Sequence, residues 1–174
     1  FLMTATCWLA AGIFASLPFY LMSVPLSFTD AVFEAMSGIT TTGSTVMIGL
    51  DHAPAGILLW RALLQWMGGI GIIVTAIAIL PMLQVGGMQL FRTESSSRTE
   101  KALPRAAPLA GWIASIYASL TAIWALMLWM AGMGPFDAIA HAMTTIATGG
   151  FSTSDQSIGA FQSPAIHWII TAGM

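Results

Sequence analysis

Charged residues are scarce in this sequence. Asp, Glu, Lys and Arg make up 7% of its 174 residues, whereas hydrophobic residues make up 57%. A soluble domain carries about a quarter charged residues, so water could not solvate the surface of a soluble fold of this size. The composition therefore predicts a membrane protein whose main partner is lipid. The formal net charge of −2 gives no reason to expect nucleic acid as a partner.

Cysteine is nearly absent as well. Cys7 is the only one, which excludes an internal disulfide and a thiolate metal site. The start of the chain has no basic residues, and its first apolar run is too long to be the hydrophobic region of a signal peptide. Since the chain starts without a methionine and ends inside an apolar run, we expect it to be a piece of a longer protein.

Long apolar runs are what the sequence has instead. Residues 1–24, 54–83 and 107–133 are each long enough to cross a membrane, and a fourth run begins at Pro164 and is cut short at Met174. Four of the five basic residues lie between the second and third runs. By the positive-inside rule this loop, 86–106, is cytoplasmic. The connections 28–51 and 136–163 are therefore expected outside. The basic residues of the loop are Arg92, Arg98, Lys101 and Arg105.

The two outer connections have the same unusual pattern. Each starts with an aspartate, Asp30 or Asp137, that is able to cap a helix. Each continues as an apolar segment of about ten residues, too short to span a bilayer, and then runs into Thr, Ser and Gly. A short helix followed by small polar residues, with both ends on one side, is typical of a re-entrant pore loop.

The two connections are also copies of one another. When 107 is added to the numbers of the first, seven of the sixteen positions from Asp30 to Thr45 are identical, without a gap. Both copies enter from the same predicted side, so the repeat is parallel. We predict an all-α integral membrane protein made of repeated helix–pore-loop–helix units, like a potassium channel, with three full spans and one truncated span. The first unit covers 1–85, the basic loop 86–106, and the second, C-terminally truncated unit 107–174.

The ends of both pore loops carry the chemistry of a cation filter. A potassium filter replaces the hydration shell of the ion with oxygen atoms, mostly backbone carbonyls, and glycine best tolerates the backbone angles that this requires. The preceding helix would direct the negative end of its dipole at the dehydrated ion. Each loop has a Thr-x-Gly core, although the final glycine of the channel sequence T-V-G-Y-G is missing. The candidate filter residues are Thr41, Thr42, Gly43 and Ser44 in the first loop and Thr148, Gly149, Gly150 and Phe151 in the second.

Two other functions stay open at this point. A non-conducting scaffold subunit is one, although a scaffold has no use for irregular backbone at membrane depth. An intramembrane hydrolase is the other, since Ser, His and Asp are present, but neither G-x-S-x-G nor H-E-x-x-H occurs. We expect no enzyme activity, no cofactor and no metal except transported potassium.

Four stretches of the sequence are distinctive. They are FTDAVFEAMSGITTTGST at 28–45, WRALLQWMGGIGIIV at 60–74, ILPMLQVGGMQLFRTE at 79–94 and FDAIAHAMTTIATGGFST at 136–153. In these stretches the sequence resembles the Trk/Ktr family of potassium transporters, in particular its TrkH-type membrane subunit. The resemblance implies four units around one pore, of which this chain holds the first two. It also implies potassium uptake across a bacterial inner membrane, a homodimer of the full subunit, and a cytosolic nucleotide-binding regulatory subunit. In related plant and fungal members a serine at the filter glycine accompanies sodium permeation, so Gly43 and Gly150 favour potassium.

Three further features have both a structural and a functional interpretation. Arg61 lies about two turns inside the second run, where a charge needs a partner; we predict that it pairs with Glu34 and braces the first pore helix. The alternatives are that it extends to the outer surface or repels cations. His141 follows Asp137 by four residues, a metal-pair spacing without an evident third ligand, and is expected to be a polar pore-helix residue. Glycines at 68, 69 and 71 are expected to allow close helix packing.

Overall fold

The structure, a computed structural model, describes residues 2–21, 26–83 and 103–174, with side chains outside 76–83 and 103–110. The described chain is helical and contains no strand. Three helices are long and apolar enough to cross a membrane: α1 (Leu2–Leu21), α3 (Ala55–Leu83) and α4 (Leu103–Met130). A shorter helix, α6 (Pro164–Gly173), ends the chain. The predicted all-α membrane fold with three full spans is confirmed.

Helix α4 differs from its predicted bounds at both ends. It begins at Leu103, inside the stretch predicted as a loop, and stops at Met130 instead of 133. The stop comes from Gly132, whose φ of 100° reverses the backbone so that Met133 N–H donates to the Leu128 carbonyl oxygen at 3.1 Å. The rest of the predicted basic loop, 86–102, lies outside the described residues, as does the side chain of Arg105.

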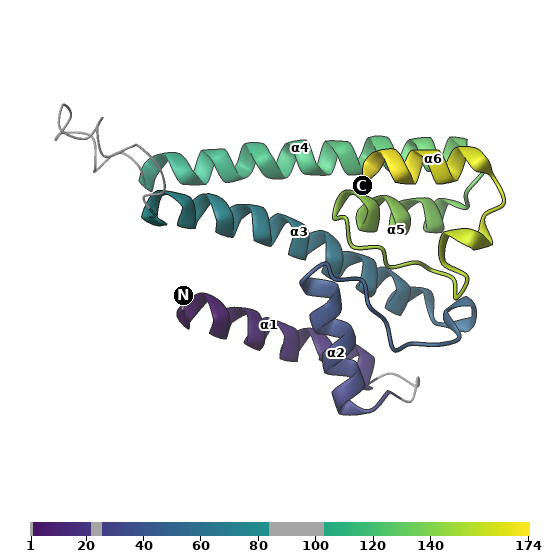
Figure 1. Ribbon diagram of the computed structural model, residues 1–174, viewed down its shortest axis with the longest axis horizontal. Helices are drawn as coiled ribbons and strands as arrows, with labels where there is room; N and C mark the ends of the chain where they lie inside the picture. Colours follow the sequence, from purple (N-terminus) through teal and green to yellow (C-terminus); the bar gives the residue numbers. More distant parts are fainter. Residues whose placement is uncertain (1, 22–25, 84–102) are drawn as a thin grey trace.

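Two short helices, α2 (Phe28–Ile39) and α5 (Pro135–Ile146), have 12 residues each. At 1.5 Å per residue each is about 18 Å long, little more than half of a hydrocarbon core of about 30 Å. Figure 1 shows both starting at the end of the molecule where α1 and α4 finish and running back toward its middle. The predicted pair of short helices entering from one side is therefore present.

The expected aspartate caps of these helices are wrong. The N-cap of α2 is Ser27, whose hydroxyl oxygen accepts the Asp30 N–H at 3.1 Å, and the residue before α5 is Gly134, followed by Pro135. Proline and a hydroxyl residue both suit a helix start, so each helix begins two residues before its aspartate. Asp30 and Asp137 lie in the first turn instead, where a carboxylate still interacts favourably with the helix dipole.

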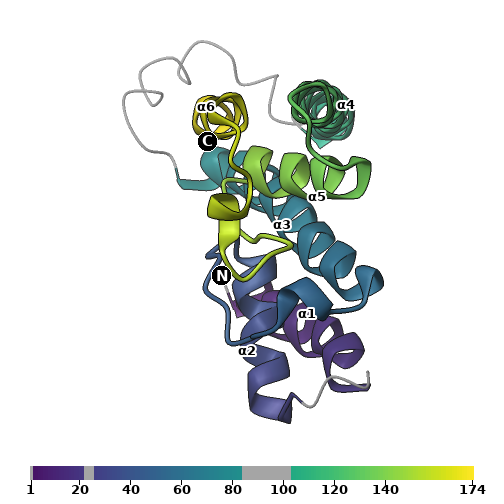
Figure 2. The ribbon, with the colours of Figure 1, turned by 90° about the vertical axis from the view of Figure 1, so that its right-hand side faces the viewer.

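Buried apolar side chains form two main clusters. One joins α1, α2 and the start of α3 around Phe19, Ala35 and Ile57, and the other joins α4, α5 and α6 around Leu128 and Ile166. Helix α3 lies between them and contacts both α2 and α5. In Figure 2, which views the molecule along α4 and α6, the two helix groups lie on either side of α3.

The outer faces of the long helices are apolar and uncovered. Met3 and Phe14 on α1 are 80% and 71% exposed, and Trp112 on α4 is 71% exposed. Such faces are stable against lipid tails or further apolar helices, and unstable in water. Most of the buried polar side chains, among them Glu34, Arg61 and Gln65, lie instead around the two loops that follow α2 and α5.

Candidate functional site: two re-entrant loops

The loops after α2 and α5 have the same backbone shape. Thr41 and Gly43 have φ angles of 56° and 79°, and their repeat partners Thr148 and Gly150 have 53° and 79°. A β-branched residue rarely adopts a left-handed φ, and such strain persists only where the surroundings hold it. The sequence repeat is thus also a repeat of an unusual conformation.

Both loops leave their helices through the same hydrogen bonds. Thr42 N–H donates to the Ser37 carbonyl at 2.9 Å, and Gly149 N–H donates to the Thr144 carbonyl at 2.8 Å. The donor and the acceptor of the second bond are those of the first bond shifted by 107 positions. The last carbonyls of each helix are therefore satisfied by the loop that follows, which turns the chain back toward the side from which it entered.

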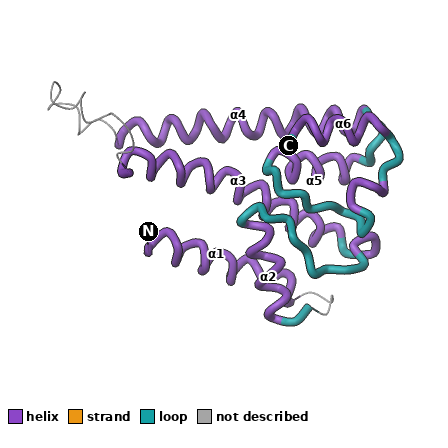
Figure 3. The backbone as a smooth tube through the Cα atoms, viewed as in Figure 1, coloured by secondary structure: helices purple, strands orange, loops and turns teal. Residues whose placement is uncertain are grey.

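The two loops lie next to each other, as the teal segments of Figure 3 show. A side chain at Gly43 would overlap the carbonyl oxygen of Gly149, so the backbones touch at this point. Farther along, Leu50 N–H donates to Asp155 Oδ1 at 3.0 Å. The space beside Gly150 is open, because a Cβ there would meet no atom within 4 Å.

A buried ion pair supports the first loop. Arg61 Nε donates to Glu34 Oε1 at 2.8 Å, and both side chains are almost completely buried. The same carboxylate accepts the Thr45 hydroxyl at 2.8 Å and the Val46 N–H at 3.0 Å. Glu34, on α2, therefore binds both the arginine of α3 and the loop that returns from α2. The two residues paired from the sequence are in contact, and Arg61 does not extend to the outer surface.

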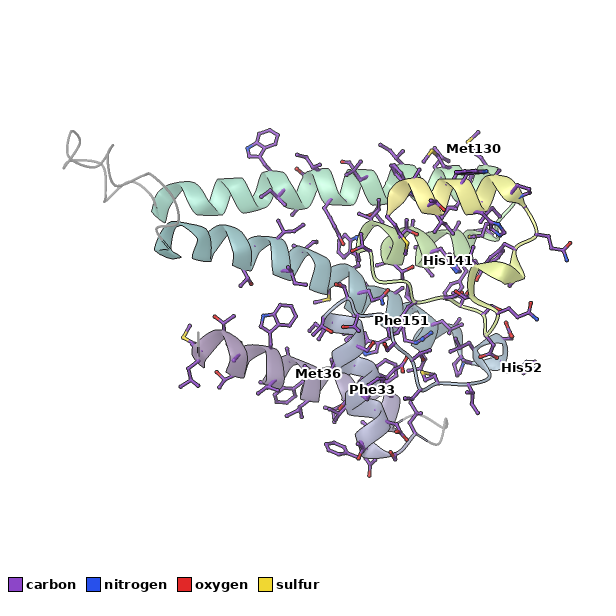
Figure 4. All side chains as sticks on the ribbon, in the orientation of Figure 1. Phe33, Met36, His52, Met130, His141 and Phe151 are labelled. Carbon is purple, nitrogen blue, oxygen red and sulfur yellow. The ribbon has the colours of Figure 1, made fainter. Side chains whose placement is uncertain are left out.

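Arg61 also reaches the second loop. Its Nη1 donates to the Ser152 carbonyl oxygen at 2.9 Å, and its guanidinium carbon lies 4.1 Å from the centre of the Phe151 ring. In Figure 4 Phe151 lies between the helices of the two groups. One arginine thus connects the two loops through a carboxylate on one side and a carbonyl and an aromatic ring on the other.

The second loop has its own support from the same helix position. His141 on α5 is the repeat partner of Glu34, and Ser152 is the partner of Thr45. His141 Nδ1 lies 2.8 Å from the Asp137 carbonyl oxygen and Nε2 lies 3.0 Å from Ser152 Oγ. The carbonyl can only accept, so Nδ1 carries the proton, and in the neutral ring Nε2 accepts the serine hydroxyl. Among described residues no group of three His, Cys, Asp or Glu could hold a metal. His141 is a buried residue of α5, and both of its ring nitrogens bind protein atoms.

A comparison with protein families decides the relationship. A family model described as TrkH, cation transport protein, matches residues 1–174. The chain belongs to this TrkH family. The resemblance inferred from the four sequence stretches is confirmed, and the family is one of transport proteins, as expected for a chain that is not an enzyme.

Individual relatives of this TrkH-family chain are close in sequence. The Trk system potassium uptake protein TrkH of Escherichia coli K12 is 52% identical over 173 residues, which are 98% of this chain and 36% of that protein. The Trk system potassium uptake protein TrkI of Halomonas elongata is 49% identical over 170 residues, 97% of this chain and 35% of that protein. The chain therefore spans about a third of the length of these relatives.

A solved structure has the same fold. The crystal structure of the potassium transporter TrkH from Vibrio parahaemolyticus superimposes with a TM-score of 0.85 at 47% identity, covering 99% of this chain and 34% of that chain. Together with the three apolar helices this makes the TrkH-family chain part of a multi-pass membrane protein.

One supporting residue of the TrkH-family site was missed by sequence reasoning. Gln65 on α3 is completely buried, its Nε2 donates to the Gly149 carbonyl at 2.9 Å, and its Oε1 accepts the Phe151 N–H at 3.1 Å. The sequence feature that points to Gln65 is its polar side chain one helical turn after Arg61, in a span that is otherwise almost entirely apolar. Its partners are backbone atoms, which the sequence does not mark.

The glycines of α3 allow close packing, as expected. A Cβ at Gly68 would overlap the Ile39 carbonyl at the end of α2, and one at Gly69 would lie 2.5 Å from the Tyr117 hydroxyl on α4. A Cβ at Gly71 would make only ordinary contact with Trp8, at 3.5 Å. The first two glycines therefore bring α3 against its neighbours, which places Gln65 and Arg61 within reach of the loops.

Proposed function

We propose that this chain contributes two of the strands that form a potassium-selective pore, and that it supports potassium uptake. The observation that carries the proposal is the pair of adjacent loops with the same left-handed backbone at Thr41, Gly43, Thr148 and Gly150. They stand at the inner ends of two short helices that stop near the membrane centre. The relatives named as potassium uptake proteins, and the potassium transporter of the same fold, support potassium as the cation.

Within the loops, the structure favours some oxygens over others as ion ligands. The carbonyl of Ser44 accepts the Ser37 hydroxyl, and that of Gly149 accepts the Gln65 amide, so both point at protein donors. The ring of Phe151 contacts Arg61, but that contact does not involve its carbonyl oxygen. We therefore assign the carbonyls of Ser44 and Gly149 to the support of the filter. Ion coordination is assigned to the other six candidates, which are Thr41, Thr42, Gly43, Thr148, Gly150 and Phe151.

The short helices add an electrostatic contribution. Each helix ends close to its Thr-x-Gly segment, at Ile39 and Ile146. The C-terminal end of a helix carries about half a negative elementary charge, and at membrane depth there is little water to screen it. A dehydrated cation near both helix ends would be stabilised, whereas an anion would be repelled.

The remaining parts of the proposal concern the whole protein. Residues 1–85 and 107–174 form two units joined by the loop 86–106, which faces the cytoplasm of a bacterial inner membrane, with the pore loops entering from outside. By family resemblance the full-length subunit forms a homodimer and works with a cytosolic nucleotide-binding regulatory subunit. The bound species is the transported potassium, without a further cofactor.

Gly150→Ser in the full-length parent protein is the cleanest test. A Cβ at Gly150 meets nothing within 4 Å, so the variant adds a side chain to open space without a clash. Uptake of potassium and sodium is measured in a potassium-uptake-deficient bacterial strain, with membrane levels checked. We expect potassium uptake to fall and discrimination against sodium to drop by about tenfold, the loss of roughly one ligand interaction of 1.4 kcal/mol.

Gly49→Ser is the matched control. Gly49 has a φ of 75° and equally open space, but it lies beyond the Thr-x-Gly segment. It carries the same cost of a left-handed side chain and none of the proposed filter role. If Gly150→Ser and Gly49→Ser behave alike and both retain normal selectivity, the second loop is not a filter strand. The scaffold function would then replace the pore.

A further inference from the structure

Helix α3 holds the second loop at three backbone sites between Gly149 and Ser152. Gln65 binds the Gly149 carbonyl and the Phe151 N–H, and Arg61 binds the Ser152 carbonyl. The two partners of Gln65 follow it by 84 and 86 positions in sequence, and the partner of Arg61 follows it by 91 positions. Because Arg61 and Gln65 are four residues apart, they lie on one face of the helix, one turn above the other. The second span of one unit thus supports the filter segment of the next.

The side-chain amide of Gln65 fits this segment at two points. Its carboxamide donates to one peptide and accepts from another, so it pairs with the backbone on both sides of Gly150. A Cβ added at Gly149 would overlap the Gln65 carboxamide, which shows how closely the two are packed. Gln65 is fully buried, and no water competes for these bonds.

Removal of this amide has a specific consequence. The carbonyl of Gly149 and the N–H of Phe151 would be buried without partners, and buried backbone groups are almost always paired. Glycines at 149 and 150 offer little resistance to rotation, so their peptide groups could turn to find other donors and acceptors. The helices themselves would keep their packing, since the two hydrogen bonds that the structure describes for the Gln65 amide both go to the loop.

We propose that Gln65 is a positioning residue for ion selectivity, which fixes the peptide groups on either side of Gly150 in the orientation that a potassium ion requires. This inference rests on the proposed pore function. Arg61 supports the same loop by binding the Ser152 carbonyl and by covering the Phe151 ring.

The test uses two substitutions at one position of the full-length parent protein. Gln65→Met keeps the length of the side chain and removes both hydrogen bonds, whereas Gln65→Asn keeps the amide and withdraws it by one methylene. Potassium and sodium uptake are measured over a range of concentrations, together with membrane levels. We expect half-maximal uptake to need about tenfold more potassium and discrimination against sodium to fall by about tenfold in both variants, because the peptide groups beside Gly150 lose the bonds that orient them.

Thr121→Val is the matched control. It removes the bond that Trp66 Nε1 on α3 donates to Thr121 Oγ1 at 2.9 Å, which ties α3 to α4 without touching either loop. This control is expected to keep normal selectivity. The variant also removes the bond that Thr121 Oγ1 donates to the Tyr117 carbonyl at 2.8 Å within α4. Its loss of stability therefore measures what missing hydrogen bonds away from the loops do.

The outcomes separate the two proposals. If Gln65→Met and Gln65→Asn reach the membrane and keep normal selectivity while Gly150→Ser loses it, the positioning role is wrong and the pore stands. If Gly150→Ser is also normal, the pore function itself fails. If neither Gln65 variant accumulates while Thr121→Val does, Gln65 holds the fold and not the orientation of the loop, and the proposal is overturned.

Discussion

Breaking the buried pair of Arg61 and Glu34 should cost more stability than any surface change. In Arg61→Gln the guanidinium disappears, and with it the bonds to Glu34, Thr45 and the Ser152 carbonyl. Glu34 stays fully buried and keeps two donors, the Thr45 hydroxyl and the Val46 N–H. The variant therefore leaves a carboxylate that has lost its countercharge and retains part of its hydrogen bonding.

The size of the effect follows from that geometry. Removing one partner of a buried ion pair costs about 3–5 kcal/mol. We expect Arg61→Gln near the lower end, because the two remaining donors of Glu34 soften the loss. Glu34→Gln should fall nearer the upper end, because the positive charge of Arg61 stays buried without its carboxylate. In the double variant both charges are gone, so its cost should fall short of the sum of the two by about 2–3 kcal/mol.

The assay is denaturant unfolding of the purified full-length parent in detergent micelles, with the two single variants and the double variant compared in one series. The pair is a brace for the first pore helix if the singles are strongly destabilised and the double recovers part of the loss. Strict additivity would mean that the two side chains act independently. Normal stability and transport in Arg61→Gln would refute the bracing role. The alternative role of repelling cations would be refuted if Arg61→Gln took up potassium no faster than the unmodified protein.

Two further predictions concern glycines. Gly43→Ala should lower the midpoint of denaturant unfolding more than Gly150→Ala. Both glycines have a φ of 79°, so both variants lose about 1–2 kcal/mol from the left-handed backbone, but only at Gly43 would the new Cβ overlap the Gly149 carbonyl. Equal shifts of the two midpoints would show that the loops do not touch. Gly68→Ala should destabilise the protein by forcing α3 away from α2. Gly71→Ala should be neutral or stabilising by up to about 1 kcal/mol, because its new Cβ would lie 3.5 Å from the Trp8 ring. The same unfolding series measures both variants, and a more stable Gly68→Ala than Gly71→Ala would contradict the packing.

Much of the architecture could be predicted from local sequence. The spans follow from length and hydropathy, and the two short helices follow from apolar segments too short to cross a bilayer. The contact of Arg61 with Glu34 was predictable because a charge inside a span needs a partner and Glu34 lies on the short helix of the same unit. The helix starts were less certain, since Ser27 and Pro135 compete with Asp30 and Asp137 for the same role.

The links between the loops could not be predicted in this way. Gln65 binds backbone atoms of residues 149 and 151, and a peptide group carries no mark in the sequence to show which side chain it will meet. The shared role of Glu34 and His141 was equally hidden, although the repeat aligns the two positions, because one copy supports its loop through a carboxylate and the other through an imidazole. An alignment that counts only identical residues does not reveal that two different side chains have the same role.

By itself the sequence determined that the chain lies in lipid, where its spans are and how deep each short helix can reach, because these depend on the length of its apolar runs. It also determined the repeat, because identical residues recur at an offset of 107. Only the tertiary structure decided that α3, the second span of the first unit, holds the loop of the second unit through Arg61 and Gln65. The physical reason is that such contacts depend on how closely α3 approaches its neighbours, at Gly68 and Gly69, and on which face it then turns toward α5.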